Sequence, residues 1–411
     1  MADPSTLHVE ARKKISRVLN SELRACTLRG KYPILGEGVV WGWQFAEILE
    51  KHLGRFITNI DAFYRLHDFV TSAVGEIPDG DREKVRLLSE HLSSDQMASL
   101  STRILEFVDS LPKAYRVFLR LGRIESLPWT ELTLGVDICL RHVSSTSTET
   151  KYRADRRNRL GRLLGDKTDH YEPFYENAVI LEVKTRGFAR KDPRSAAIAE
   201  AWEIIREVLF AGKAIGLFNS ERRAGAFGPP KETLFFLEET EPSSIELEEV
   251  DFDHRVREHL GRYAVSPLDE VPLRRDVIFA SHARRIATLL DRAKAADADP
   301  VRAGALWGFL SETMDNDTLK FLHTCIGIEA ILGLDSDKQG VTELLADRCG
   351  FLLGENRSTR SFWKEQFKAM YDVRSKVVHG RRRKLQKKEL RQLAVAELIL
   401  VELIKTETKS L

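Results

Sequence analysis

Apolar residues recur at intervals of three and four through most of the first 110 residues, which is the spacing that places them on one face of an α-helix. The expected helical segments span residues 39–56, 62–74 and 82–111, and a Ser-rich stretch interrupts the last of them. Pro78 and Gly80 mark a turn before the third of these helices. We therefore expect residues 1–112 to form a helical N-terminal region.

The pattern changes near residue 113, where short runs of β-branched and aromatic residues alternate with polar ones, as in half-buried strands. The expected strands span residues 114–121, 130–143, 177–187, 212–220 and 232–239. One amphipathic helix is expected at 195–210, and the polar stretch 144–159 is typical of a loop. Acidic residues and prolines in 240–273 indicate a linker or peripheral segment. We interpret residues 113–272 as an α+β domain with a mostly antiparallel sheet, ending in this linker.

Helical spacing returns from residue 273 to the C-terminus. The expected helices span residues 276–296, 301–313, 317–333, 341–354, 361–380 and 387–407. Asn316 or Asp317 can cap the third of these helices, and Gly333 can end it. The last helix is apolar nearly all round, which indicates that it is buried centrally or shared with a partner subunit. The predicted fold class is therefore α+β multidomain, with an all-α helical bundle at residues 273–411.

Composition narrows the class of protein. The 411 residues are 43% hydrophobic and 31% charged, which excludes a wholly disordered or collagen-like chain. Lys and Arg total 64 against 62 Asp and Glu, so any nucleic-acid contact must come from a local basic patch. The sequence has no run of 18 apolar residues and no apolar leader segment, so we expect neither a membrane span nor a secretory signal. The four cysteines are not closely paired, and we expect reduced thiols in a cytoplasmic protein rather than a metal site.

The segment YDVRSKVVHGRRRK, residues 371–384, carries the candidate chemistry. Arg374 and His379 lie five residues apart, at the expected end of a helix. Five residues correspond to about 140° around an ideal helix axis. The imidazole must therefore turn toward the arginine at the helix end, or pair with the arginine of a second subunit across a two-fold axis.

A local basic patch surrounds this pair. Eight basic residues and no acid occur between Arg374 and Lys388, in a chain that is otherwise nearly neutral. Such a patch attracts a phosphate backbone. The residues that we expect to bind nucleic acid are Lys376, Arg381, Arg382, Arg383 and Lys384.

An arginine and a histidine suit RNA cleavage without a metal. A guanidinium can hold the scissile phosphate through two parallel hydrogen bonds and oppose the charge that develops there. An imidazole, with an ordinary pKa of about 6.5, can take a proton from the 2′-hydroxyl or give one to the leaving 5′ oxygen. The alternative without chemistry is that His379 caps a helix end and that the basic run is solvated surface.

Residues 301–380 resemble the Apea-like branch of the HEPN superfamily. The resemblance rests on GIEAILGL at 327–334, TELLADRCGFLLG at 342–354 and YDVRSKVVHG at 371–380. HEPN domains are helical bundles, usually dimeric, and many are metal-independent ribonucleases whose signature is an arginine, four to six residues and a histidine. Here Arg374 and His379 match that signature in its short form. Ser375 stands where many members have Asn, Asp or His after the arginine.

The resemblance implies further roles for residues of the C-terminal third. Glu329 is expected to orient Arg374 by an ion pair, Asp372 to steer the same guanidinium, and Arg348 to match a recurrent arginine of the middle helix. The implied protein is a homodimeric, cytoplasmic endoribonuclease of a prokaryotic antiviral defence system, of the abortive-infection or toxin kind. RNA is its substrate, it needs no cofactor or metal, and an inhibitor or trigger protein is a further partner. Residues 1–272 are then expected to sense the trigger, silence the nuclease or choose the RNA.

Two alternatives stay open. The HEPN-like region can be a non-catalytic module that binds nucleic acid, nucleotides or protein. Alternatively, Glu182 and Lys184 lie two apart on an expected strand and share a face, as in one half of a metal-dependent nuclease core. The second acid of such a core would be Asp166 or Asp169.

Overall fold

The structure is a computed structural model of the 411-residue chain, and it divides into two compact units. The described residues are 7–34, 41–75, 84–124, 126–144, 153–155, 171–173, 177–220, 231–239, 246–267, 274–292, 299–333, 340–381 and 383–409. The first unit comprises Met1–Arg116, Lys184–Glu200 and Leu237–Ser244. The second comprises Val117–Val183, Ala201–Phe236 and Ile245–Leu411. The expected turn at 78–81 and most of the expected loop 144–159 lie outside the described residues.

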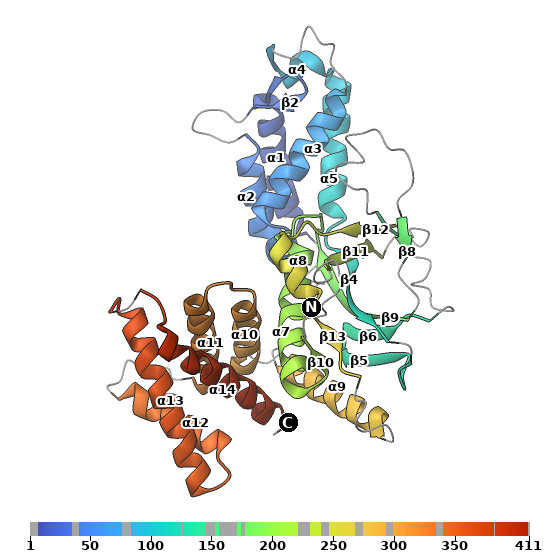
Figure 1. Cartoon of the computed structure of the whole chain (residues 1–411). Coiled ribbons are helices and arrows are strands. Elements are labelled where there is room, and N and C mark those ends of the chain that lie inside the picture. Colours follow the sequence, from blue (N-terminus) through green and yellow to red (C-terminus); the bar gives the residue numbers. More distant parts are fainter. Residues whose placement is uncertain are drawn as a thin grey trace. The chain divides into compact units, whose positions relative to one another are not determined.

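Helices dominate the first unit, as the sequence predicts. They are α1 (Val9–Ala25), α2 (Trp43–Leu53), α3 (Asn59–Val74), α4 (Leu88–His91) and α5 (Ser94–Asp109), with the 3-10 turn η1 (Gly54–Phe56). Helix α5 lies beside both α1 and α3 in Figure 1, and the inward faces of the three bury Leu19, Leu66 and Ile104. Thr58 and Ser93 begin α3 and α5, each with a reciprocal capping box that satisfies backbone N–H groups at the helix start.

A small sheet in the first unit was not predicted. Strand β1 (Thr27–Arg29) pairs antiparallel with β2 (Tyr32–Pro33) and with β3 (Val85–Leu87). The expectation of a helical segment over 82–111 is therefore wrong at its start, whereas its Ser-rich interruption is present as the break between α4 and α5. Pairing with β1, a segment distant in the sequence, supplies the backbone hydrogen bonds of β3, and local helical spacing cannot reveal such a partner.

The main sheet has the strand order β5-β6-β9-β4-β11-β12-β7-β8. Its strands are β4 (Lys113–Arg123), β5 (Glu131–Gly135), β6 (Ile138–His142), β7 (Arg153–Asp155), β8 (Tyr171–Pro173), β9 (Ala178–Gly187), β11 (Leu234–Glu238) and β12 (Glu246–Glu249). The pairs β5–β6, β6–β9, β7–β8 and β11–β12 are antiparallel, whereas β12–β7 is parallel. The expected strand 130–143 is thus a hairpin, because a turn at Val136 and Asp137 divides it. The mixed α+β class that the sequence predicts is confirmed.

Two stretches of the second unit depart from the expectation. Helix α7 (Ala196–Ile215) runs beyond the predicted 195–210, so the strand expected at 212–220 is wrong over its first half. Only β10 (Phe218–Asn219) remains of it, paired with β13 (Ala264–Val265). The interpretation of 240–273 as a linker is also wrong for its described part, which contains β12, α8 (His254–Leu260) and β13. Burial of Leu260 and Tyr263 fixes this segment, which its acidic composition did not indicate.

The C-terminal part is helical, as expected. Its helices are α9 (Arg275–Arg292), α10 (Pro300–Glu312), α11 (Asp317–Leu332), α12 (Val341–Leu353), α13 (Arg357–Val378) and α14 (Leu390–Lys409), with the 3-10 turn η5 (Lys387–Glu389). Helices α10 and α11 pack together, as do α12 and α13, and α14 contacts all of α9 to α13 (Figure 1). The residues of α14 that are buried are Leu393, Ala396, Ile399, Leu400, Leu403, Ile404 and Thr408. The apolar last helix is therefore buried among its neighbours, which is one of the two arrangements that its composition indicated.

Local chemistry sets the limits of these helices. Asn316, rather than Asp317, caps α11, because its side-chain oxygen accepts hydrogen bonds from the N–H groups of Thr318 and Leu319 at 2.9 and 3.2 Å. None of the helices in the described ranges is long and apolar enough to cross a membrane. All four cysteines are free.

The C-terminal half of α7 contacts α10 at three places within the second unit. Arg302 Nε lies 2.6 Å from Glu207 Oε2. Burial raises the pKa of Glu207 to about 7, although Arg302 opposes that shift. Nearby, the ring of Phe210 lies against Gly308, where an added Cβ would come within 2.3 Å of a ring carbon. A glycine is therefore needed at this crossing for the two helices to approach.

A buried polar cluster lies at the C-terminal end of α10. Glu312 pairs with Lys213 of α7 and accepts a hydrogen bond from the Tyr263 hydroxyl at 2.7 Å. His259 Nε2 lies 3.6 Å from the same carboxylate, and burial lowers the pKa of this imidazole to about 4. The cluster joins α7, α8 and α10 around one carboxylate that is 15% exposed.

Candidate functional site

Glu329 on α11 and Arg374 on α13 form a two-point ion pair. Arg374 Nε lies 2.8 Å from Glu329 Oε1, and Arg374 Nη2 donates a hydrogen bond to Oε2 at 2.9 Å. One hydrogen bond and one close charge contact hold the guanidinium beside this carboxylate. The ion pair that the sequence indicated between these residues is therefore present.

This ion pair is largely shielded from solvent. The side chains of Arg374 and Glu329 are 21% and 26% exposed. The guanidinium also lies over the ring of Tyr371, with Cζ 5.4 Å from the ring centroid, and Tyr371 stacks on Phe367 at 5.5 Å. Burial raises the pKa of Glu329, and the neighbouring Arg374 opposes that shift. An aromatic stack and a carboxylate thus hold the arginine from two sides.

His379 occupies the C-terminal cap of α13 and is exposed. Its backbone N–H donates to the carbonyl of Ser375 at 3.0 Å, and Gly380 follows with φ +68°, a conformation that favours glycine and ends the helix. The sequence prediction of a helix end at this histidine is confirmed. Within the described residues, the imidazole makes no hydrogen bond or ion pair, so it is available to solvent.

Arg374 and His379 have no mutual contact within one chain. The backbone stays helical as far as the bond from His379 to Ser375, so the separation of about 140° around the axis applies. Val373 and Val377 are buried and mark the inward face of α13, beside which Arg374 lies, whereas His379 is exposed. The structure therefore does not bring the guanidinium and the imidazole together within one chain.

Neither Asp372 nor Ser375 has a hydrogen bond or ion pair with Arg374 in this structure. Asp372 forms an ion pair with Lys376, one helical turn further on. Ser375 is half-buried and offers its carbonyl to the helix end. The carboxylate of Asp372 is thus used at the surface of α13, and it does not steer the guanidinium in this structure.

Arg348, which the resemblance matches to a recurrent arginine, lies on α12 and contacts the end of α11. It donates a hydrogen bond to the carbonyl of Gly333, the residue that ends α11. The N–H of Gly333 in turn donates to the carbonyl of Glu329 at 2.9 Å. Arg348 therefore acts on the helix turn that carries Glu329, and not on Arg374 itself.

The basic segment that follows α13 is held at one point. Its described and exposed cations are Arg381, Arg383 and Lys384. Arg382 lies outside the described residues, and Lys376 is engaged by Asp372. The N–H of the buried Leu385 donates to Thr318 Oγ1 at 3.0 Å, which fastens the segment to the first turn of α11. The exposed cations can therefore meet a phosphate backbone from an anchored position.

Glu182 and Lys184 on β9 do not form a surface pair. Glu182 is buried and lies 3.1 Å from Arg141 Nε, whereas Lys184 is exposed. Asp166 and Asp169 lie outside the described residues. Over the ranges that the structure describes, no three metal-ligating side chains gather in one place. The Glu182 carboxylate is thus part of a structural ion pair.

Tyr371 is the residue of the candidate site that sequence reasoning missed. It precedes Arg374 by three positions and follows Phe367 by four, and both separations place side chains next to each other on a helix. This spacing was the signal that could have identified the aromatic support of the guanidinium.

Comparison with known proteins adds no relative from which a role could be transferred. No family model, no curated protein and no solved structure matches the chain. The likeness to HEPN domains therefore depends on the three sequence segments alone, and function must be argued from the site.

Proposed function

We propose that the protein is a metal-independent endoribonuclease that acts in the cytoplasm, in a prokaryotic antiviral defence system of the abortive-infection or toxin kind. The observation that carries the chemistry is the guanidinium of Arg374, fixed in plane by Glu329, with the exposed His379 at the end of the same helix. The kind of biological system comes from the resemblance to HEPN domains.

The reaction needs a cation for the phosphate and a group that moves a proton. The contacts of Arg374 with Glu329 use Nε and Nη2, so Nη1 can still donate to a phosphate oxygen. His379 takes the proton of the 2′-hydroxyl, the 2′ oxygen attacks phosphorus, and the bond to the 5′ oxygen breaks. The products are a 2′,3′-cyclic phosphate and a 5′-hydroxyl, which receives a proton from an imidazolium.

We propose further that the two groups meet between two copies of the chain. In a two-fold dimer of HEPN-like bundles, each copy's His379 faces the Arg374 of the other, which gives two equivalent sites. Exposed apolar residues next to the site support such a contact. Val378, beside His379, is 49% exposed, and Leu319, on the turn that anchors the basic segment, is 47% exposed.

The remaining residues then govern the nuclease. We propose that residues 1–272 detect a trigger or hold the nuclease silent, with a protein inhibitor or activator as partner. The exposed cations Arg381, Arg383 and Lys384 bind the RNA backbone on either side of the cleaved bond.

Cleavage of an end-labelled RNA in the presence of EDTA tests the proposal. We expect the wild type to leave 2′,3′-cyclic phosphate ends. We expect Arg374→Ala and His379→Ala each to lower the rate at least about 100-fold, as loss of a charge stabiliser or an acid–base group does. Arg357→Ala, at the exposed start of the same helix, is the control and should cleave at the wild-type rate. Equal cleavage by wild type and His379→Ala would overturn the assignment.

Mixing the two inactive variants tests the composite site. If each site takes Arg374 from one copy and His379 from the other, a mixed dimer of Arg374→Ala and His379→Ala regains one intact site. Random exchange then restores about a quarter of wild-type activity, since half of the dimers are mixed and one site in two is intact. Failure of a fully exchanged mixture to regain activity would reject the shared site.

A non-catalytic nucleic-acid-binding module is the second candidate. Two observations favour it. Two nitrogens of the Arg374 guanidinium already contact Glu329 and are not available to a phosphate, and the basic segment is exposed. In that case RNA binding falls when Arg383 and Lys384 are replaced, persists in Arg374→Ala, and is not followed by cleavage.

A further inference from the structure

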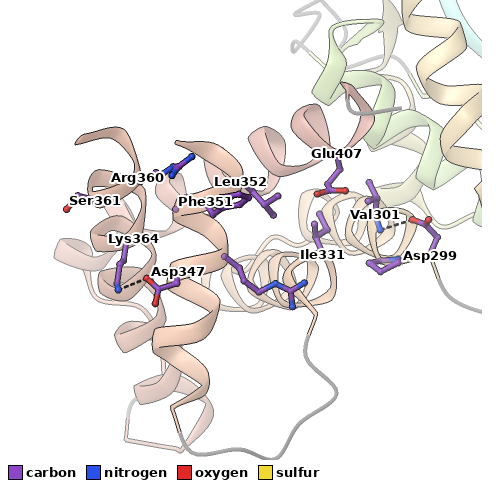
Figure 2. Close-up of a pocket in the computed structure, with 13 residues that line it drawn as sticks. Asp299, Val301, Ile331, Asp347, Phe351, Leu352, Arg360, Ser361, Lys364 and Glu407 are labelled. Carbon is purple, nitrogen blue, oxygen red and sulfur yellow. Dashed lines mark hydrogen bonds and ion pairs between the residues drawn. The ribbon is translucent and has the colours of Figure 1, made fainter. Parts of the chain in front are cut away.

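A cavity of about 980 Å³ lies among the C-terminal helices, at the upper end of the size range of small-molecule sites. Its wall is built from the first turn of α10, the last turn of α11, the second half of α12, the first half of α13 and the end of α14. Figure 2 shows the cavity with its lining residues. Five elements thus converge on one space, close to the turn of α11 that carries Glu329.

The two ends of the cavity differ in charge. Figure 2 places Arg360, Ser361 and Lys364 of α13 at one end, and Glu407 of α14 with Asp299 at the other. Apolar side chains lie between the ends, among them Phe351, Leu352 and Ile331. A ligand that fits this lining has an anionic end, an apolar or flat body, and hydrogen-bond donors at its far end.

Most of the lining charges already have protein partners. The Asp299 carboxylate caps α10, where it accepts hydrogen bonds from the N–H groups of Val301 and Arg302 at 2.8 and 3.1 Å. Lys364 is shared between Asp347 and Glu343. These groups shape the wall and are not free to recognise a ligand.

Three charged groups of the lining have hydrogen-bond donors or acceptors that no protein group uses. Arg360 donates from Nε to the Gly354 carbonyl at 3.0 Å, which leaves both of its Nη groups. Arg348 donates from Nη1 to Gly333, which leaves Nη2 and Nε. Glu407 has no hydrogen bond or ion pair with any residue that the structure describes. Two guanidinium groups are therefore available to an anion, and one carboxylate is available to donors.

An exposed aromatic ring stands between these groups. Phe351 is 67% exposed, which is unusual for phenylalanine, and the guanidinium of Arg360 lies over its ring with Cζ 4.9 Å from the centroid. A flat heterocycle can stack on such a ring or on the guanidinium plane. This feature distinguishes a site for a planar ligand from a site for a lipid chain or a simple anion.

We propose that this cavity binds a guanine nucleotide. The phosphate is held by Arg348 and Arg360, as charge-assisted and bidentate contacts of guanidinium groups allow. The base lies against Phe351. The N1–H and N2–H donors of guanine point to the same side of the ring, so both can reach the single carboxylate of Glu407.

The cavity wall is connected to Arg374 by three successive contacts. Arg348 donates to the Gly333 carbonyl, the Gly333 N–H donates to the Glu329 carbonyl, and the Glu329 carboxylate holds Arg374. A phosphate that binds Arg348 changes its hydrogen bond to the Gly333 carbonyl. Nucleotide binding is therefore expected to alter the rate of RNA cleavage. This coupling rests on the proposed function, whereas binding itself does not.

Isothermal titration of the full-length protein with GMP, GTP, ATP and inorganic phosphate tests the site. We expect a guanine nucleotide to bind, and to bind more tightly than ATP or phosphate. Arg360→Gln and Glu407→Gln should each weaken it at least about tenfold, as loss of one charged hydrogen-bonding partner does. The matched control is Arg357→Gln, on the same helix but outside the lining. Thermal unfolding of each variant shows that the fold is retained.

Three results would overturn the inference: no guanine nucleotide binds, the two variants bind it like the wild type, or phosphate alone binds equally well. The two proposals can fail separately. A wild-type protein that binds a guanine nucleotide but cleaves no RNA rejects the ribonuclease alone. Cleavage by a wild type that binds no nucleotide rejects the cavity assignment alone, and a cleavage rate unchanged at saturating GMP rejects the coupling.

Discussion

Replacement of Glu329 by glutamine isolates the contribution of the carboxylate to the candidate site. The wild-type carboxylate accepts a hydrogen bond from Arg374 Nη2 at 2.9 Å, and its other oxygen lies 2.8 Å from Arg374 Nε. Glutamine keeps the size of the side chain but removes the charge, and its NH₂ group faces a guanidinium donor where an oxygen had been. One of the two contacts is therefore lost and the other weakened.

The expected magnitude follows from the burial of the pair. A hydrogen bond to a charged group contributes about 1.5–3 kcal/mol, and a fully exposed ion pair about 0–1 kcal/mol. Side chains that are 21% and 26% exposed lie between these cases, so we expect Glu329→Gln to lower the free energy of unfolding by about 1–2 kcal/mol. Each kcal/mol corresponds to about 2–4 °C in the melting temperature of a large domain.

Urea unfolding and RNA cleavage should be measured together on this variant. The control is Glu397→Gln, whose wild-type carboxylate lies 2.6 Å from Lys320 but is 40% exposed, and it should cost less than about 1 kcal/mol. Under the proposed function, Glu329→Gln also lowers the cleavage rate, because the guanidinium of Arg374 is no longer held in plane. A variant that matches the wild type in unfolding midpoint and in cleavage would show that the ion pair neither stabilises the helices nor positions the arginine.

Three further predictions concern the helices around the site. Gly308→Ala should lower stability by about 1–3 kcal/mol, because the new Cβ meets the Phe210 ring within 2.3 Å, and the urea midpoint measures this loss. Asn316→Ala should cost about 1 kcal/mol by removing the cap of α11, which thermal unfolding can detect. The buried His259 has a pKa lowered to about 4, so its contribution to stability is present above about pH 6.5 and is lost as pH falls toward 4. The loss amounts to at most about 3 kcal/mol, and urea unfolding at pH 7 and pH 5 in the wild type and in His259→Phe measures it.

Each of these predictions has a result that contradicts it. An unchanged midpoint for Gly308→Ala would mean that α7 and α10 separate without cost. Asn316→Asp retains a cap and should behave like the wild type, so equal losses for the alanine and aspartate variants would exclude capping as the cause. The difference in stability between wild type and His259→Phe should change with pH, and a constant difference would show that the imidazole does not titrate in this range.

The sequence predicted the C-terminal helices best, because their boundaries depend on local chemistry. Asn316 before an apolar repeat, and Gly333 and Gly380 after one, specify helix limits without reference to the rest of the chain. Strand β3 and the acidic strand β12 were missed, since each is defined by a partner strand that lies elsewhere in the sequence.

The candidate site was predictable only in part, for the same physical reason. The spacing of Arg374 and His379 is visible in one helix, and the resemblance supplied Glu329. The contact of Arg348 with the end of α11 depends on how α12 packs, which no spacing indicates. The cavity could not be predicted, because its wall is assembled from five helices that meet only in the folded chain.

The close fit of α7 and α10 has a practical consequence for anyone who wishes to isolate the C-terminal helices. A fragment that begins at residue 273 would lose Phe210 and Lys213, and it would expose Phe309 and leave Glu312 without its cation. The newly exposed surface would contain an apolar patch and an unpaired carboxylate. Exposed apolar patches promote aggregation during purification. A fragment that contains the C-terminal helices should therefore also include the part of α7 that packs against α10, although α7 lies far from them in the sequence.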